Sequence, residues 1–119
     1  MRIVVADDDP DTVRTLRLLL EDQGHEVKTA ADGPAALYAV RDFGADILLL
    51  DIGMPGMNGF EVARTLRADT ETSACVLIAV SGYGQPEDCE RSREVGFNHH
   101  LVKPADFSAL ERITGFDPS

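Results

Sequence analysis

Apolar residues are grouped along the chain in short runs that alternate with amphipathic stretches. Continuous runs fill positions 3–6, 47–50 and 76–80 and do not alternate with polar residues. Strands that are apolar on both faces are typical of a parallel sheet covered by helices on both sides. Two runs that are more polar or shorter, 26–30 and 99–102, are typical of strands at the edges of such a sheet. We therefore expect five strands at these positions.

Between and after these runs the sequence predicts five helices. Apolar side chains recur at helical spacing over 10–23, 34–43 and 59–68. A fourth helix, 86–95, opens at a proline and stops before a glycine, and a fifth covers 105–113. The apolar faces of the first three helices are expected to comprise Val13, Leu16, Leu19 and Leu20; Ala35, Leu37, Ala39 and Val40; and Phe60, Val62, Ala63 and Leu66.

The alternation of strands and helices predicts the fold class. Five repeats of strand and helix favour a doubly wound α/β fold, (βα)5, with right-handed crossovers and a five-stranded parallel sheet in the flavodoxin-like order 2-1-3-4-5. With 119 residues the chain has room for one domain, expected over 1–119. In this order the first and third strands are neighbours, so their carboxyl ends meet at one edge of the sheet.

Acidic residues follow both of these neighbouring strands. Asp7-Asp8-Asp9 comes directly after the first apolar run, and Asp51 after the third. Asp9 before Pro10 is ordinary helix-start chemistry, which leaves the other three unexplained. Ligands of open α/β sheets bind beyond the carboxyl ends of the strands. Because clustered carboxylates repel one another and offer only oxygen ligands, the sequence predicts a site for Mg²⁺.

Charge and composition narrow the class of protein. The chain has 21 acidic and 11 basic residues, a formal net charge of −10, which argues against nucleic-acid binding because phosphate contacts need a basic patch. No apolar stretch approaches the ~20 residues of a membrane span, so we expect a soluble cytoplasmic protein that binds neither nucleic acid nor membrane. Cys75 and Cys89 form no CxxC pair and are expected to be reduced thiols, with Cys75, Met54 and Met57 as packing or loop residues.

Three further features fall at the carboxyl ends of predicted strands. Ser81-Gly82 ends the fourth strand, Lys103-Pro104 ends the fifth, and a glycine-rich segment, 53–59, follows Asp51. Together with the acid pair after the first strand, this spacing resembles the receiver domain of two-component response regulators of the chemotaxis-regulator kind. The resemblance covers essentially the whole chain.

The resemblance implies a role for each polar residue of the edge. Asp51 would accept a phosphoryl group from a histidine kinase or a histidine phosphotransfer protein. Asp8, Asp51 and the main-chain carbonyl of Gly53 would hold Mg²⁺, for which Mn²⁺ could substitute, and Asp7 would act largely through a bound water. Lys103 would supply a second positive charge to the phosphoryl oxygens.

The resemblance also implies a conformational switch. The Ser81 hydroxyl would donate to a phosphoryl oxygen, and His100, where the family usually has Tyr or Phe, would then move inward. The face formed by the fourth helix, the fifth strand and the fifth helix would contact an output partner that the sequence does not identify. Its expected exposed members are Glu90, Glu94, His100 and Glu111. His99 and His100 cannot bind one metal ion together, because neighbouring strand residues point to opposite faces, and His99 is given no role.

If the chain is a receiver domain, it is a phosphoprotein that assists its own phosphorylation and dephosphorylation, and it is not an enzyme that acts on separate substrates. We expect it to be a monomer or a weak dimer. The alternative is a Mg²⁺-dependent aspartyl-phosphate phosphatase of the haloacid-dehalogenase kind, but such enzymes have a second Asp two residues after the nucleophile, where this chain has Gly53. A flavin-binding module would need a hydroxyl-rich phosphate loop after the first strand, where this chain has acidic residues.

The sequences of residues 81–88 and 96–104 are similar to those of receiver domains fused to hybrid histidine kinases.

Overall fold

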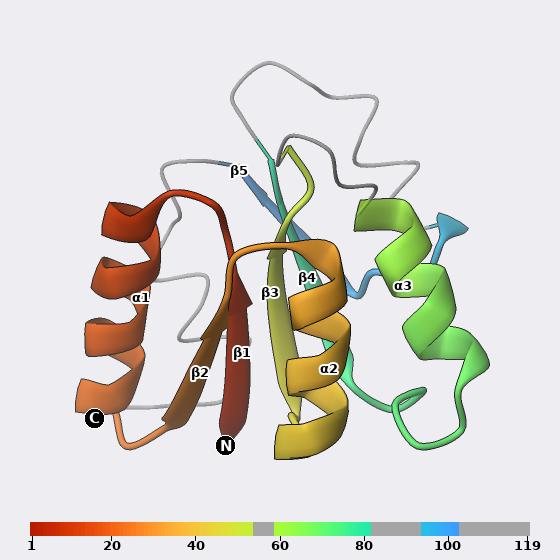
Figure 1. The fold of residues 1–119 in the computed structure, drawn as a ribbon, viewed down its shortest axis with the longest axis horizontal. Helices are drawn as coiled ribbons and strands as arrows, with labels where there is room; N and C mark the ends of the chain where they lie inside the picture. Colours follow the sequence, from red (N-terminus) through yellow and green to blue (C-terminus); the bar gives the residue numbers. More distant parts are fainter. Residues whose placement is uncertain (54–58, 82–93, 103–119) are drawn as a thin grey trace.

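The computed structural model describes residues 1–53, 59–81 and 94–102 of the chain. Within them, one sheet has the order β2-β1-β3-β4-β5, with all neighbouring strands parallel (Figure 1). Residues 26–30 and 99–102 form the two edge strands, as predicted. The predicted doubly wound α/β fold with strand order 2-1-3-4-5 is confirmed. The strands are β1 (Arg2–Ala6), β2 (Glu26–Ala30), β3 (Ile47–Asp51), β4 (Val76–Ser81) and β5 (His99–Val102).

Three helices of the described residues lie close to their predicted positions. They are α1 (Pro10–Asp22), α2 (Gly33–Phe43) and α3 (Gly59–Ala68). Of the two remaining predicted helices, 105–113 lies outside the described residues, and so does 86–95 apart from its last two positions. Within the described part of the chain, we find no helix with the length and apolar character needed to cross a bilayer.

Capping side chains fix where α1 and α2 begin. Asp9 Oδ1 accepts from the N–H of Asp11 at 3.1 Å, and Asp32 Oδ1 accepts from the N–H of Ala35 at 2.8 Å. Such caps satisfy main-chain donors that a helix leaves unpaired in its first turn. At the other end of α2, Gly44 adopts the left-handed conformation with φ of 67°. The ordinary helix-start role predicted for Asp9 is confirmed.

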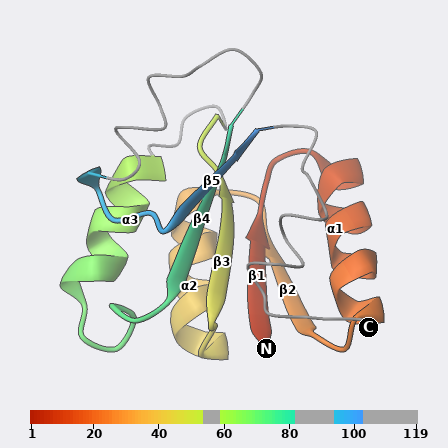
Figure 2. The ribbon, with the colours of Figure 1, turned by 180° about the vertical axis from the view of Figure 1, so that it is seen from behind.

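The helices cover both faces of the sheet. Figures 1 and 2 show α2 and α3 on one face and α1 on the other. Val40 of α2 and Leu66 of α3 belong to one buried cluster, and Leu16 and Leu20 of α1 belong to a second on the opposite face. Because every strand between the two edges is covered on both sides, its residues are apolar at consecutive positions.

Two of the predicted helix faces were partly wrong. Leu19 is 38% exposed, although Leu16 and Leu20 are buried. Successive residues of a helix are about 100° apart, so the consecutive leucines 18–20 cannot all face the sheet. In α2, Ala35 is exposed and its neighbour Ala36 is completely buried, because the stripe that contacts the sheet passes through Ala36 and Val40.

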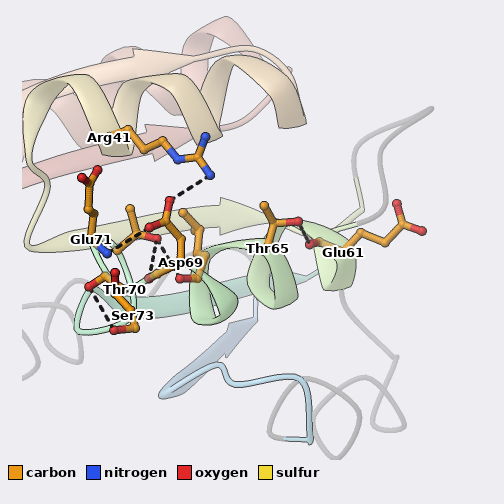
Figure 3. A network of polar contacts seen from close by, with 9 residues as sticks. Arg41, Glu61, Thr65, Asp69, Thr70, Glu71 and Ser73 are labelled. Atoms are coloured by element: carbon orange, nitrogen blue, oxygen red, sulfur yellow. Dashed lines mark hydrogen bonds and ion pairs between the residues drawn. The ribbon is translucent and has the colours of Figure 1, made fainter.

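A polar network holds the turn between α3 and β4 against α2 (Figure 3). Arg41 Nη2 lies 3.0 Å from Asp69 Oδ2, and Asp69 Oδ1 accepts from the N–H of Glu71 at 2.9 Å. The buried Thr72 hydroxyl donates to the carbonyl of Leu66 at 2.7 Å. These contacts fix the path of the chain from the end of α3 to the start of β4.

Cys75 lies at the end of this turn and is part of the core, as predicted. Its side chain is 6% exposed, and burial raises the pKa of the thiol from 9.0 to about 11 although Arg67 nearby acts in the opposite direction. In Cys89→Ser protein at about pH 8, we expect Cys75 to react with iodoacetamide roughly a hundredfold more slowly when folded than in urea, because so little thiolate is present.

The same pKa difference predicts a change in stability with pH. The folded pKa is the higher one, so the contribution of the neutral thiol is present below pH 9.0 and is lost as the pH rises toward about 11. Cys75→Val should lose less stability over that interval than the parent protein. Equal alkylation rates in the folded and unfolded protein would contradict the burial of the thiol.

Candidate metal centre at the carboxyl edge of the sheet

Three carboxylates meet where β1 and β3 end. Asp7, Asp8 and Asp51 each present an oxygen atom, and these atoms all lie within 4.8 Å of one another. The cause is the sheet topology: β1 and β3 are parallel neighbours in which Ala6 pairs with Leu50, so the residues that follow emerge side by side. The predicted gathering of these acids is confirmed, and the cluster could hold a metal ion.

Burial and main-chain contacts orient two of the three carboxylates. Asp7 and Asp51 are only 5% and 6% exposed, whereas Asp8 is exposed. Asp7 Oδ1 accepts from the N–H of Asp9 at 2.9 Å, and Asp51 Oδ1 accepts from the N–H of Gly53 at 2.8 Å. Three carboxylates whose oxygen atoms lie within 4.8 Å of one another would repel each other when ionised. The three side chains therefore suit a small cation that prefers oxygen ligands.

The segment after Asp51 stays close to its carboxylate. The N–H of Ile52 donates to the carbonyl of Val80 at 3.0 Å, which continues the contact between β3 and β4 beyond the last strand residue. A Cβ atom on Gly53 would lie 3.3 Å from Asp51 Oδ1, and one on Gly59 would lie 2.8 Å from Ile52 Cγ2. The two glycines therefore allow this segment to pack tightly beside the cluster.

The two other side chains predicted for the site belong to the last residue of β4 and to the residue that follows β5 in the sequence. Ser81 is the last residue of β4, one position beyond Val80, which pairs with Asp51. Its main chain therefore lies at the same edge as the carboxylates. Lys103 follows β5 directly in the sequence but lies outside the described residues. The cluster of three acids is thus the part of the predicted site for which the structure gives side-chain geometry.

The predicted switch face is described only in part. His100 lies in β5 with its side chain partly buried, and the neighbouring His99 is exposed. Glu94 is exposed, as expected, whereas Glu90 and Glu111 lie outside the described residues, as do Met54 and Met57.

Comparison with known proteins gives one consistent match. Residues 3–114 match the response regulator receiver domain family. Protein PilH of Pseudomonas aeruginosa is 38% identical over 109 residues, which are 92% of this chain and 90% of that protein. The DNA-binding response regulator MtrA of Mycolicibacterium smegmatis is 38% identical over 103 residues, 87% of this chain but only 44% of MtrA.

A solved structure supports the same match. The high-resolution structure of the chemotaxis response regulator CheY4 of Vibrio cholerae superimposes with a TM-score of 0.85 at 28% sequence identity. The superposition covers 94% of this chain and 97% of CheY4. The likeness thus extends over nearly the whole chain in both sequence and fold.

Proposed function

We propose that this chain, which belongs to the response regulator receiver domain family, carries signals in a cytoplasmic two-component system by accepting a phosphoryl group on Asp51. The donor would be a histidine kinase or a histidine phosphotransfer protein. The observation that carries the proposal is the gathering of the Asp7, Asp8 and Asp51 oxygens within 4.8 Å at the carboxyl edge of the sheet. In the wider family, an acidic pocket of this kind binds Mg²⁺.

Asp51 is the proposed nucleophile. A carboxylate oxygen would attack the phosphorus of a phosphohistidine, the P–N bond would break, and an acyl phosphate would form on Asp51. Its carboxylate is nearly buried and is held by the Gly53 N–H, so its orientation is set before the donor arrives. The leaving imidazole takes a proton and returns to its neutral form.

Asp8, Asp51 and the Gly53 carbonyl are the proposed metal ligands, and Asp7 is proposed to act mainly through a bound water. Bound Mg²⁺, or Mn²⁺ in its place, would supply positive charge to the phosphoryl oxygens during transfer. The three acids suit this role because they offer only oxygen donors and come from two adjacent strands. Asp8 is the exposed member of the cluster, so it is the ligand most accessible to an entering hydrated ion.

Lys103 and Ser81 complete the proposed mechanism. The Lys103 ammonium would pair with a phosphoryl oxygen, and the Ser81 hydroxyl would donate to another once the group is in place. Movement of Ser81 would allow His100 to turn inward and alter the face formed by β5 and the predicted helices on either side of it. The main chain of Ser81 at the edge that holds Asp51 supports this part of the proposal.

Metal binding is expected to stabilise the fold. Mg²⁺ at roughly ten times its dissociation constant should add about 1.4 kcal/mol to the free energy of unfolding, because it binds only the folded cluster. Asp8→Ala should remove most of this gain. Thermal melts with and without Mg²⁺ measure the effect.

Asp9→Asn is the matched control for this experiment. Asp9 belongs to the same acidic row, but its carboxylate caps α1 through Asp11 and Thr12, and asparagine is an equally good cap. This variant should keep the full response to Mg²⁺. A wild-type midpoint that does not change at saturating Mg²⁺ would argue against a metal site in the cluster.

A further inference from the structure

Arg67 lies in the last turn of α3, is partly buried, and makes five side-chain hydrogen bonds. Its Nη1 donates to the carbonyls of Ser73 and Cys75 at 2.7 and 2.6 Å. Its Nε and Nη2 donate to the carbonyl of Gly96 at 2.9 and 2.7 Å, and Nη2 also donates to Asn98 Oδ1 at 2.6 Å. These five bonds match the five N–H donors of a guanidinium group.

The acceptors belong to two segments that are distant in sequence. Ser73 and Cys75 lie in the turn before β4, where Figure 3 shows Ser73 beside the network around Asp69. Gly96 and Asn98 lie in the turn before β5. Arg67 therefore joins the starts of two neighbouring strands to the end of a helix.

Asn98 passes this constraint to β4 and β5. Its Oδ1 accepts from the N–H of Leu77 at 2.8 Å, and its own N–H donates to the carbonyl of Leu77 at 2.8 Å. The next residue, His99, pairs with Ile78, and His100 follows opposite Ala79. The register that places His100 in β5 is thus set at Asn98.

A second contact of α3 reaches the same turn from the other end of the helix. Phe60, in the first turn of α3, meets Phe97 edge to face, with ring centroids 6.5 Å apart and Phe97 5% exposed. Gly96 fits closely under Arg67, because a Cβ atom there would lie 2.8 Å from Arg67 Cγ and the φ of Gly96 is 108°. The helix that follows the Asp51 segment therefore holds residues 96–98 at both of its ends.

We propose that Arg67 is a positioning residue that fixes the place of His100 by holding the turn before β5. The functional consequence rests on the proposed function, in which His100 moves when Asp51 is phosphorylated. Without the guanidinium bonds, the entry to β5 would open locally while Asp51 and the acidic cluster at the opposite end of the sheet kept their geometry. His100 would then respond less to events at Asp51.

Hydrogen exchange in the free protein tests the positioning role without any phosphoryl group. In Arg67→Gln, we expect the amides of Leu77 and Asn98 to exchange about tenfold faster or more, because bonds to a charged donor are lost at the turn. The amide of Leu48, in the central strand, should change by a much smaller factor. Arg64→Gln, an exposed arginine on the same helix, is the matched control and should leave all three rates unchanged.

Two exchange results would overturn the proposal. Equal acceleration at Leu77, Asn98 and Leu48 would show that Arg67 contributes only to global stability. Unchanged exchange at Asn98 would show that the turn holds its place without the arginine. Arg67→Lys should fall between the wild type and Arg67→Gln, because a single ammonium group cannot reach the carbonyls on both sides.

The effect on His100 is measured with the phosphoryl mimic beryllofluoride and Mg²⁺. In wild-type protein, we expect amide NMR shifts at Gly53 and at His100. In Arg67→Gln, the shift at Gly53 should persist and the shift at His100 should fall by about half or more. A full-sized shift at His100 in this variant would overturn the coupling. Absence of any shift in the wild type would count against the proposed function, and the exchange rates would still decide whether Arg67 positions β5.

Discussion

Asp51→Asn should lose phosphoryl acceptance entirely and keep its fold. Asparagine offers no carboxylate nucleophile, so incubation with acetyl phosphate and Mg²⁺ should add no phosphoryl group, measured by intact mass. The amide oxygen can still accept from the Gly53 N–H, as Asp51 Oδ1 does at 2.8 Å. One of three clustered charges is removed, so the melting temperature without metal should not fall.

Asp9→Asn is the control for the loss of labelling. It makes the same chemical change two residues from Asp7, at a carboxylate that accepts hydrogen bonds from the first turn of α1. This variant should be labelled to the wild-type extent. If Asp51→Asn were labelled at full yield, the acceptor would have to be a different residue.

Leu48→Ala should cause a large loss of stability. Leu48 lies in β3 at the centre of the sheet, is completely buried, and belongs to the cluster between the sheet and α2 and α3. Removing its side chain leaves a cavity in a close-packed layer, for which we expect a loss of about 2–5 kcal/mol. Urea unfolding at equilibrium measures this loss through the shift of the transition midpoint.

Leu18→Ala makes the same substitution on the surface. Leu18 is 53% exposed on α1, so its truncation should change stability by no more than about 0.5 kcal/mol. Similar losses in the two variants would mean that β3 is not the buried centre of the fold.

The fold could be predicted because the burial pattern of each strand is simple. Residues 47–50 are apolar at every position because helices cover both faces of β3, and β2 is more polar because it lies at an edge. The errors came from helices, where three consecutive leucines in α1 do not reveal which of them faces the sheet. In the structure Leu20 faces it, and Leu18 and Leu19 are exposed.

Of the functional residues, those of the acidic cluster could be predicted from the sequence, and Arg67 could not. Asp7, Asp8 and Asp51 could be predicted because they stand at the carboxyl ends of strands that must be neighbours in this fold. Arg67 could not, because a basic residue in the last turn of a helix is ordinary and usually solvated. Its partner Asn98 lies 31 residues away in the sequence. Its other three acceptors, in Ser73, Cys75 and Gly96, are main-chain carbonyls, which no sequence pattern identifies.

We expect this chain to accept one phosphoryl group in a metal-dependent way and to retain it. The most direct measurement follows wild-type protein by intact mass during incubation with acetyl phosphate, with Mg²⁺ and separately with a chelator, while the release of inorganic phosphate is recorded. We expect one added phosphoryl group per chain with Mg²⁺, little or none with the chelator, and slow release of phosphate. Rapid release of phosphate over many turnovers, without labelled protein, would contradict the receiver function and favour the phosphatase alternative. Labelling that is unaffected by the chelator would contradict the proposed role of the acidic cluster.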